Sequence, residues 1–105
     1  MSHVADTVVF TFLHEDGPMQ EVQKWLTEEN QYGPLVEVSD HAGGHKALQC
    51  QLWVGAFNYL DIDEFVRVVF AQPWKYPEHV CIAICDEHED QPRIWRHPLA
   101  TSETP

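Results

Sequence analysis

The chain has 105 residues, of which 44% are hydrophobic and 11% aromatic. This composition predicts one folded domain with its own core and excludes a disordered acidic chain. Seventeen acidic and six basic residues give a formal net charge of −11. Because the lysines and arginines are scattered, we expect no direct nucleic-acid binding and a preference for basic protein surfaces.

Three cysteines without framework spacing do not resemble a secreted disulfide scaffold, and the N-terminal MSHVADTVVF lacks the pattern of a signal peptide. We therefore expect a cytoplasmic protein. No apolar run approaches the ~20 residues that a membrane span requires, so no membrane association is expected. Residues 1–100 are predicted to form a single α+β domain, and residues 101–105 a flexible C-terminal tail.

The first predicted element is a strand from Thr7 to Leu13, rich in β-branched and aromatic residues. The side chains expected to face the core from this strand are Val8, Phe10 and Phe12. A helix follows, which Asp16 and Pro18 are expected to start and which ends before QYGP. Its apolar residues at helical spacing are Met19, Val22, Trp25 and Leu26.

Two further strands, Leu35 to Ser39 and Lys46 to Val54, flank the segment SDHAGGHKAL and are predicted to form a hairpin. The second strand alternates, and the residues assigned to the core-facing side are Leu48, Cys50, Leu52 and Val54. Gly43-Gly44 is typical of a turn that needs a positive φ, and Asp40 can support such a turn. We therefore favour a turn over a metal site here, although His41 and His45 flank the glycines.

A second helix is predicted after Asp61, which resembles the first residue of a capping box with Glu64. Its apolar stripe comprises Ile62, Phe65, Val66, Val69 and Phe70, and Pro73 should stop it. His79 to Cys85 then reads as a fourth strand, and Arg93 to Trp95 as a short fifth.

The order β-α-β-β-α-β is that of the ferredoxin-like split βαβ arrangement, with one antiparallel sheet and both helices on one face. This likeness concerns architecture alone, because unrelated functions share the arrangement. The predicted core consists of Phe10, Phe12, Val22, Leu26, Val36, Leu52, Phe65, Val69, Ile82 and Ile84.

One end of this predicted sheet gathers histidines, namely His14, His41, His45 and His79. Their expected positions on different strands and faces separate His45 from His79 by ~10 Å, which is too far for joint ligation of zinc. Cys81 and Cys85, four residues apart on one strand, are also too distant to share a metal or form a disulfide. We therefore expect no bound metal, no cofactor and no nucleophilic cysteine.

The opposite end collects nine of the seventeen acids, because the first helix ends there, the second begins there and the fourth strand leaves there. These acids are Glu28, Glu29, Asp61, Asp63, Glu64, Asp86, Glu87, Glu89 and Asp90. Any one group of these acids is explained by its interaction with the positive end of a helix dipole or by its contribution to solubility. Nine acids together also favour a site for a basic partner.

The sheet face away from the helices is expected to be mixed, with an apolar centre. Its assigned residues are Val9, Thr11, Leu13, Leu35, Glu37, Gln49, Gln51, Trp53, Cys81, Ala83 and Cys85. The C-terminal segment with Ile94, Trp95 and Leu99, a second subunit or another partner should cover it.

Three functions remain open from the sequence. The first is a small acidic protein-binding factor, of inhibitor, immunity or regulatory type, whose acidic end docks on a basic surface, with nucleic-acid mimicry as one form of this binding. The second is a small enzyme or ligand-binding domain that uses the histidine-rich end. The third is a structural subunit that dimerises through the open sheet face.

Overall fold

The computed structural model describes residues 3–12, 15, 17–38, 43–45 and 50–98. The strands are β1 (Val4–Thr11), β2 (Val36–Glu37), β3 (Gln51–Asn58), β4 (Val80–Asp86) and β5 (Arg93–Arg96). The α-helices are α1 (Gly17–Lys24) and α2 (Ile62–Ala71), with a π-helical turn η1 (Trp25–Glu29) and a 3₁₀ turn η2 (Pro77–His79).

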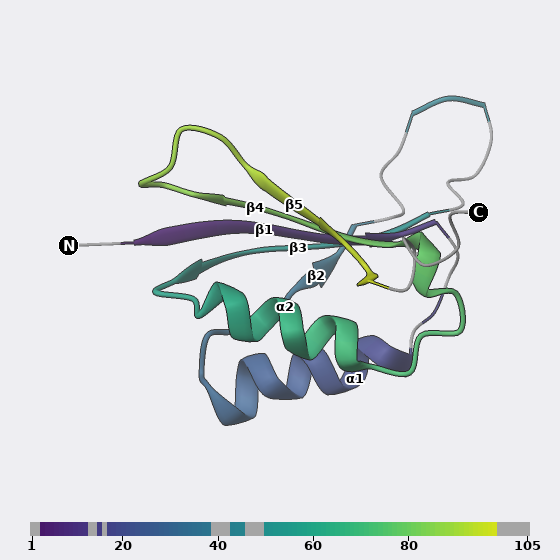
Figure 1. Cartoon of the computed structure of the whole chain (residues 1–105), viewed down its shortest axis with the longest axis horizontal. Helices are drawn as coiled ribbons and strands as arrows, with labels where there is room; N and C mark the ends of the chain where they lie inside the picture. The colour runs from purple at the N-terminus through teal and green to yellow at the C-terminus, as the bar shows by residue number, and fades with distance from the viewer. Residues whose placement is uncertain (1–2, 13–14, 16, 39–42, 46–49, 99–105) are drawn as a thin grey trace.

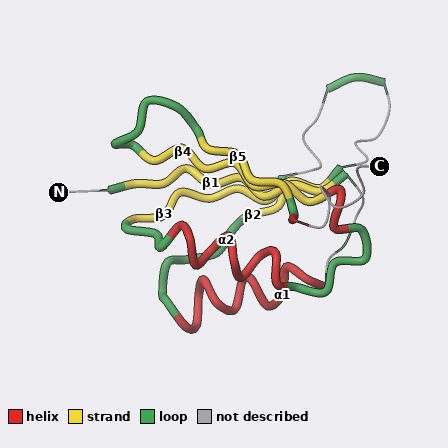
Figure 2. Tube along the Cα trace, in the orientation of Figure 1, coloured by secondary structure: helices red, strands yellow, loops and turns green. Residues whose placement is uncertain are grey.

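The five strands form one antiparallel sheet in the order β2-β3-β1-β4-β5, and both helices cover the same face (Figure 1, Figure 2). The predicted α+β fold is therefore confirmed, and the strand order is consistent with a ferredoxin-like arrangement that carries an additional edge strand. The expected tail, residues 101–105, lies outside the described residues.

The second helix begins and ends where its sequence signals indicate. The Asp61 side chain accepts a hydrogen bond of 3.2 Å from the Glu64 amide and so caps the first turn of α2. Phe65 and Val69 are fully buried beneath this helix. At its other end, the carbonyl of Val69 accepts a hydrogen bond from the Gln72 amide (3.3 Å) and a second one from the Trp74 indole N–H (2.7 Å).

The first helix is tied to the neighbouring chain by one glutamine. The Gln23 amide nitrogen donates to the carbonyl of Leu35 (2.7 Å), and the Gln23 carbonyl oxygen accepts from the Leu35 amide (2.8 Å). These two bonds satisfy the backbone amide and carbonyl of Leu35, as a neighbouring strand would do. Leu35 itself is 2% exposed. Gln23 thereby positions the segment that leads into β2.

The predicted orientation of the first strand is wrong. The residues of β1 that face the helices are Ala5, Thr7, Val9 and Thr11, all of them buried. Phe10 is half-buried on the opposite face, and Phe12 is 53% exposed. The alternation favours the wrong side here, because the outward residues of β1 are larger and more apolar than the inward ones. Ala5 and Val9 are the β1 residues that share the core with Phe65 and Met19.

The predicted orientation of β3 is wrong for the same reason, since paired residues of the neighbouring strands β1 and β3 lie on the same face of the sheet. Thr11 lies opposite Gln51 and Val9 opposite Trp53, so Gln51 and Trp53 face the helices. Gln51 is completely buried, and its side-chain oxygen accepts a hydrogen bond from the Glu15 amide (3.2 Å). The residues wrongly assigned to the core-facing side include Leu52 and Val54, which lie on the opposite face, and Cys50, which is half-buried; Leu48 lies outside the described residues.

Strand β3 also extends further than predicted and ends at Asn58. Phe57 near this end is 2% exposed and belongs to the core. The glycine two residues before it is required by packing, since a Cβ at Gly55 would lie 2.8 Å from the Phe57 ring. At the edge strand the expected sides are exchanged, because Leu35 is buried whereas Val36 is 58% exposed.

Strand β4 has the predicted orientation. Val80, Ile82 and Ile84 are buried beneath the helices, whereas Cys81 and Cys85 face away from them. Strand β5 extends the sheet beside β4, so the described part of the C-terminal segment does not cover the open face as one expectation held. The predicted core residues that are buried are Val22, Leu26, Phe65, Val69, Ile82 and Ile84, and those that are not are Phe10, Phe12, Val36 and Leu52.

Candidate functional site

Three acid-bearing segments meet at one end of the molecule. The end of η1, the start of α2 and the turn between β4 and β5 all lie at the end where the chain begins (Figure 1). Hydrogen bonds connect these segments: the Asp61 amide donates to the Tyr32 hydroxyl (3.1 Å), and the Tyr59 backbone amide donates to the backbone carbonyl of His3 (2.8 Å). We call the nine acids on these segments the acidic pole; they are Glu28, Glu29, Asp61, Asp63, Glu64, Asp86, Glu87, Glu89 and Asp90.

Three of these acids have short-range partners on their own element. Asp61 caps α2, Glu64 forms an ion pair with Arg67, and Glu89 lies 3.3 Å from the Arg93 guanidinium. The hydrogen bond from Arg67 lowers the pKa of Glu64 below its usual range, with a further contribution from the positive charge. These pairs are exposed, and exposed pairs stabilise a fold only weakly.

Asp86 is a structural carboxylate that the sequence did not reveal as such. It is 7% exposed, and its two oxygens accept hydrogen bonds from the His88 amide (2.9 Å) and from His3 Nε2 (2.5 Å). The rings of His3 and His88 pack edge to face with centroids 4.5 Å apart. The bond from the His88 amide, followed by the bond from His3, lowers the pKa of Asp86.

Glu87 continues this connection between the chain start and the β4–β5 turn. Its carboxylate accepts a hydrogen bond from the Val4 amide (2.6 Å), and its own amide donates to the Val4 carbonyl (2.9 Å). Asp86 and Glu87 together therefore hold the beginning of β1 in place. An aspartate at the start of a turn often accepts a hydrogen bond from the amide two residues later, so the sequence could have indicated the bond between Asp86 and the His88 amide. Nothing in the sequence indicates the pairing of Glu87 with Val4.

Four acids of the pole remain without a partner among the described residues, and they are Glu28, Glu29, Asp63 and Asp90. All four are exposed. They come from each of the three segments, so unpaired negative charge is spread across the whole end of the molecule. These are the carboxylates that a binding partner can engage without breaking a contact within the described chain.

The Asp86 contacts predict a pH dependence of stability. A carboxyl group whose pKa is lower in the folded state stabilises the fold above its unfolded-state pKa and loses this contribution as pH falls through the folded-state pKa. We therefore expect Asp86→Asn to flatten the loss of stability between neutral and acidic pH. Urea unfolding of the parent and the variant at a series of pH values checks this. Parallel curves would show that the His88 and His3 contacts do not perturb Asp86.

The histidine-rich end is described only in part. His14 and His41 lie outside the described residues, His45 is exposed, and His79 is half-buried beside the Tyr76 ring. Gly44 has a φ of +94°, as the predicted turn requires. Within residues 3–12, 15, 17–38, 43–45 and 50–98, no three histidine, cysteine, aspartate or glutamate side chains are grouped so that they could hold a metal ion.

Three cysteines belong to the described part of the chain. Cys50, Cys81 and Cys85 are free thiols, each half-buried. Burial raises the pKa of the Cys81 thiol, which reduces the fraction of reactive thiolate. This shift is opposite to the one that nucleophilic catalysis requires.

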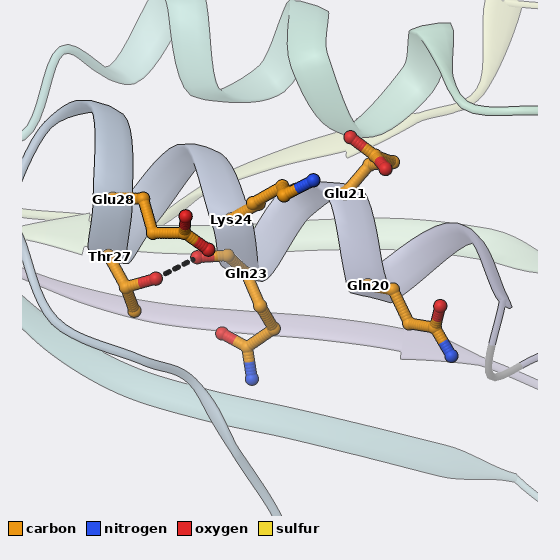
Figure 3. A pocket seen from close by; sticks show the side chains of 6 residues that line it. All are labelled: Gln20, Glu21, Gln23, Lys24, Thr27 and Glu28. Atoms are coloured by element: carbon orange, nitrogen blue, oxygen red, sulfur yellow. Dashed lines mark hydrogen bonds between the residues drawn. The ribbon is translucent and has the colours of Figure 1, made fainter.

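Two depressions lie along α1. The first, of about 270 Å³, is lined by side chains of α1 and η1 alone. The Thr27 hydroxyl beside it donates a hydrogen bond to the backbone carbonyl of Gln23 (Figure 3). The second, of about 440 Å³, lies between this helix and β3 and is lined by Met19, Gln20, Gln23 and Trp53. The Trp53 indole N–H has no partner within the described chain, but the nitrogen is covered completely and a molecule in the depression cannot reach it. Neither depression gathers reactive groups from several elements, so neither resembles an active site.

Comparison of the chain with protein-family models, curated proteins and solved structures gives no match. Neither helix of the described chain combines the length and apolar character needed to cross a bilayer. Fold and surface thus define a small α+β protein with two notable surfaces, the acidic pole and the sheet face opposite the helices.

Proposed function

We propose that the protein is a small protein-binding factor that docks its acidic pole on a basic surface of a partner protein. The observation that carries this proposal is a set of four exposed carboxylates without a partner among the described residues, on three segments of one end. They are Glu28, Glu29, Asp63 and Asp90. Binding through this end would act by occlusion, as in an inhibitor, immunity-type or regulatory protein.

The charge balance of this end supports a basic partner. Nine carboxylates lie there, and the arginines paired with them are Arg67 and Arg93. Crowded like charges repel one another, so a cationic surface that approaches them gains both attraction and relief of repulsion. Proteins that bind nucleic-acid phosphates carry such cationic surfaces, and a carboxylate-covered end can mimic the phosphates that they recognise.

Removing unpaired acids should weaken binding without unfolding the protein. We expect Asp63→Asn/Asp90→Asn to lower the association rate with a captured partner, and the further addition of Glu28→Gln/Glu29→Gln to lower it again. The attraction depends on the summed field and is screened over ~8 Å at physiological salt, so the salt dependence should weaken in parallel. The measurement is the association rate as a function of ionic strength.

The matched control is Glu21→Gln/Glu37→Gln, which removes the same charge as the double variant from exposed positions outside the acidic pole. Parent, variants and control are immobilised and exposed to a native-cell lysate at low and high salt. We expect the parent and the control to retain the same salt-sensitive partner and the quadruple variant to lose it. Equal retention by the quadruple variant would contradict the proposal.

A further inference from the structure

The sheet face opposite the helices, here called the open face, carries a continuous apolar row across all five strands. In register from one edge to the other, this row is Val36, Val54, Val8, Ala83 and Ile94. The neighbouring row contains Phe10, which lies between Leu52 and Cys81. Such a row across a whole sheet is the pattern of a buried sheet surface and not of a solvated one.

No described element covers this face. Both helices lie on the other side of the sheet, and β5 lies beside β4 within it (Figure 1). The two ends of the apolar row are strongly exposed, Val36 at 58% and Ile94 at 68%, and Phe12 beside Phe10 is 53% exposed. Large exposed apolar patches of this kind mark interaction surfaces.

The charge of the open face differs from that of the rest of the molecule and indicates which kind of partner fits it. The charged residues in its registered rows are Asp6, opposite Cys85, and Arg96, opposite Cys81. The face is therefore close to neutral, although the chain as a whole carries −11. A basic partner is attracted to the acidic pole and not to this face, whereas two copies of the face can meet without like-charge repulsion between the residues in contact.

The size of the open face also fits a pair of identical surfaces. The five strands, of eight, two, eight, seven and four residues, give a flat area of roughly 460 Å² per subunit at ~4.8 Å spacing and ~3.3 Å rise. Two such faces bury roughly 900 Å² before side-chain relief is counted, so the expected dimer lies at the weak end of specific interfaces, which begin near ~1,200 Å². Two apolar sheet faces packed ~10 Å apart form the core of a sandwich.

We propose that the open face binds a second copy of this chain, which makes the protein a two-fold symmetric homodimer with the sheets inside and the helices outside. The contact is isologous, so each side chain of the apolar row contributes twice. This inference is independent of the acidic pole, because the proposed partner-binding residues lie at the end of the molecule and not on the open face.

Sedimentation equilibrium of the untagged chain tests the proposal directly. We expect a dimer at micromolar concentration and a melting temperature that rises with protein concentration, since association stabilises the folded state by mass action. Ala83→Arg, in the middle of the apolar row, should give a monomer whose melting temperature is independent of concentration. Ile94→Lys at the exposed end of the row should weaken the dimer at least tenfold while placing the new charge where it cannot disturb the fold.

The matched control is Tyr76→Lys, which places the same charge at an exposed aromatic position in the loop before η2. It should leave the dimer intact, and circular dichroism verifies that all variants are folded. A parent chain that stays monomeric at 100-fold higher concentration would overturn the proposal. So would an Ile94→Lys variant that dimerises as strongly as the parent.

The rate of thiol labelling in the folded protein is a second measurement of dimerisation, and it distinguishes loss of the dimer from loss of stability. Cys81 and Cys85 face the open side of the sheet, so dimerisation should shield them from a maleimide. We expect labelling of the parent to slow several-fold as concentration rises, and labelling of the folded Ile94→Lys variant to be faster and less dependent on concentration. Concentration-independent labelling of the parent would contradict face-to-face packing.

Discussion

Phe65→Ala should lower the free energy of unfolding by about 3–5 kcal/mol, because it removes a completely buried ring and leaves a cavity. The ring lies in the main core with Val9, Met19 and Leu26. These neighbours belong to the sheet, the other helix and its π-helical turn, so they cannot collapse onto the vacated volume without moving whole elements. Urea unfolding with an unchanged m-value measures the loss.

Phe12→Ala is the matched control, because it removes the same ring from a position that is 53% exposed. We expect a loss below about 1 kcal/mol when the protein is dilute enough to be monomeric. This comparison also tests the corrected orientation of β1. Similar losses for the two variants would restore the inward orientation of Phe12 that the sequence favoured.

Gln23→Ala should destabilise the protein by about 2–3 kcal/mol, because it leaves both backbone groups of Leu35 without their partners. Each group left unsatisfied in a partly buried place costs about 1–3 kcal/mol, and here water can compensate in part. Gln23→Glu retains the acceptor for the Leu35 amide and removes the donor to its carbonyl. We therefore expect an intermediate loss for this variant.

The control for Gln23 is Gln20→Ala on the same helix, where the side chain is exposed. This change should alter the unfolding free energy by no more than about 0.5 kcal/mol. Denaturant midpoints of the three variants decide the matter. If Gln20→Ala and Gln23→Ala cost the same, the bridge to Leu35 contributes nothing beyond helix propensity.

The helices could be predicted because their signals are local and redundant. Asp61 and Pro73 bound the second helix, and its apolar stripe has the 3.6-residue period of a helix with one buried face. Strand β4 was also oriented correctly, because its large aliphatic residues alternate with cysteines and an alanine. In each case the pattern itself distinguishes the inner side from the outer one.

The alternation in β1 and β3 favours the wrong side, because open-face residues such as Phe10 and Leu52 are more apolar than helix-facing residues such as Gln51. Val8 and Val9 are the same residue type, and only the folded structure shows that Val9 belongs to the core with Phe65 and Met19. Gln51 is the converse case, since a glutamine is assigned outward unless its buried partner, the Glu15 amide, is known. Such partners are set by tertiary contacts between residues far apart in the chain.

The acidic pole could be located from chain direction alone, since the ends of three elements define it. Which of these acids have partners within the fold could not be predicted, because His3 and Val4, which bond to Asp86 and Glu87, come from the opposite end of the sequence. Only the folded chain shows that these two acids hold the start of β1, whereas Asp63 and Asp90 have no described partner. The carboxylates that remain for a binding partner are therefore a subset of the predicted nine.

The two outer strands have a consequence for how far assembly can proceed. β2 has two residues and follows Pro34, and β5 carries arginines at both ends between Pro92 and Pro98. Short, charged or proline-flanked borders are poor templates for another strand, so the described sheet resists lateral growth into fibrils. In the proposed two-fold dimer, moreover, the contact buries the apolar face of both subunits. We therefore expect association that begins on the apolar face to end at a closed dimer and not to continue to larger assemblies.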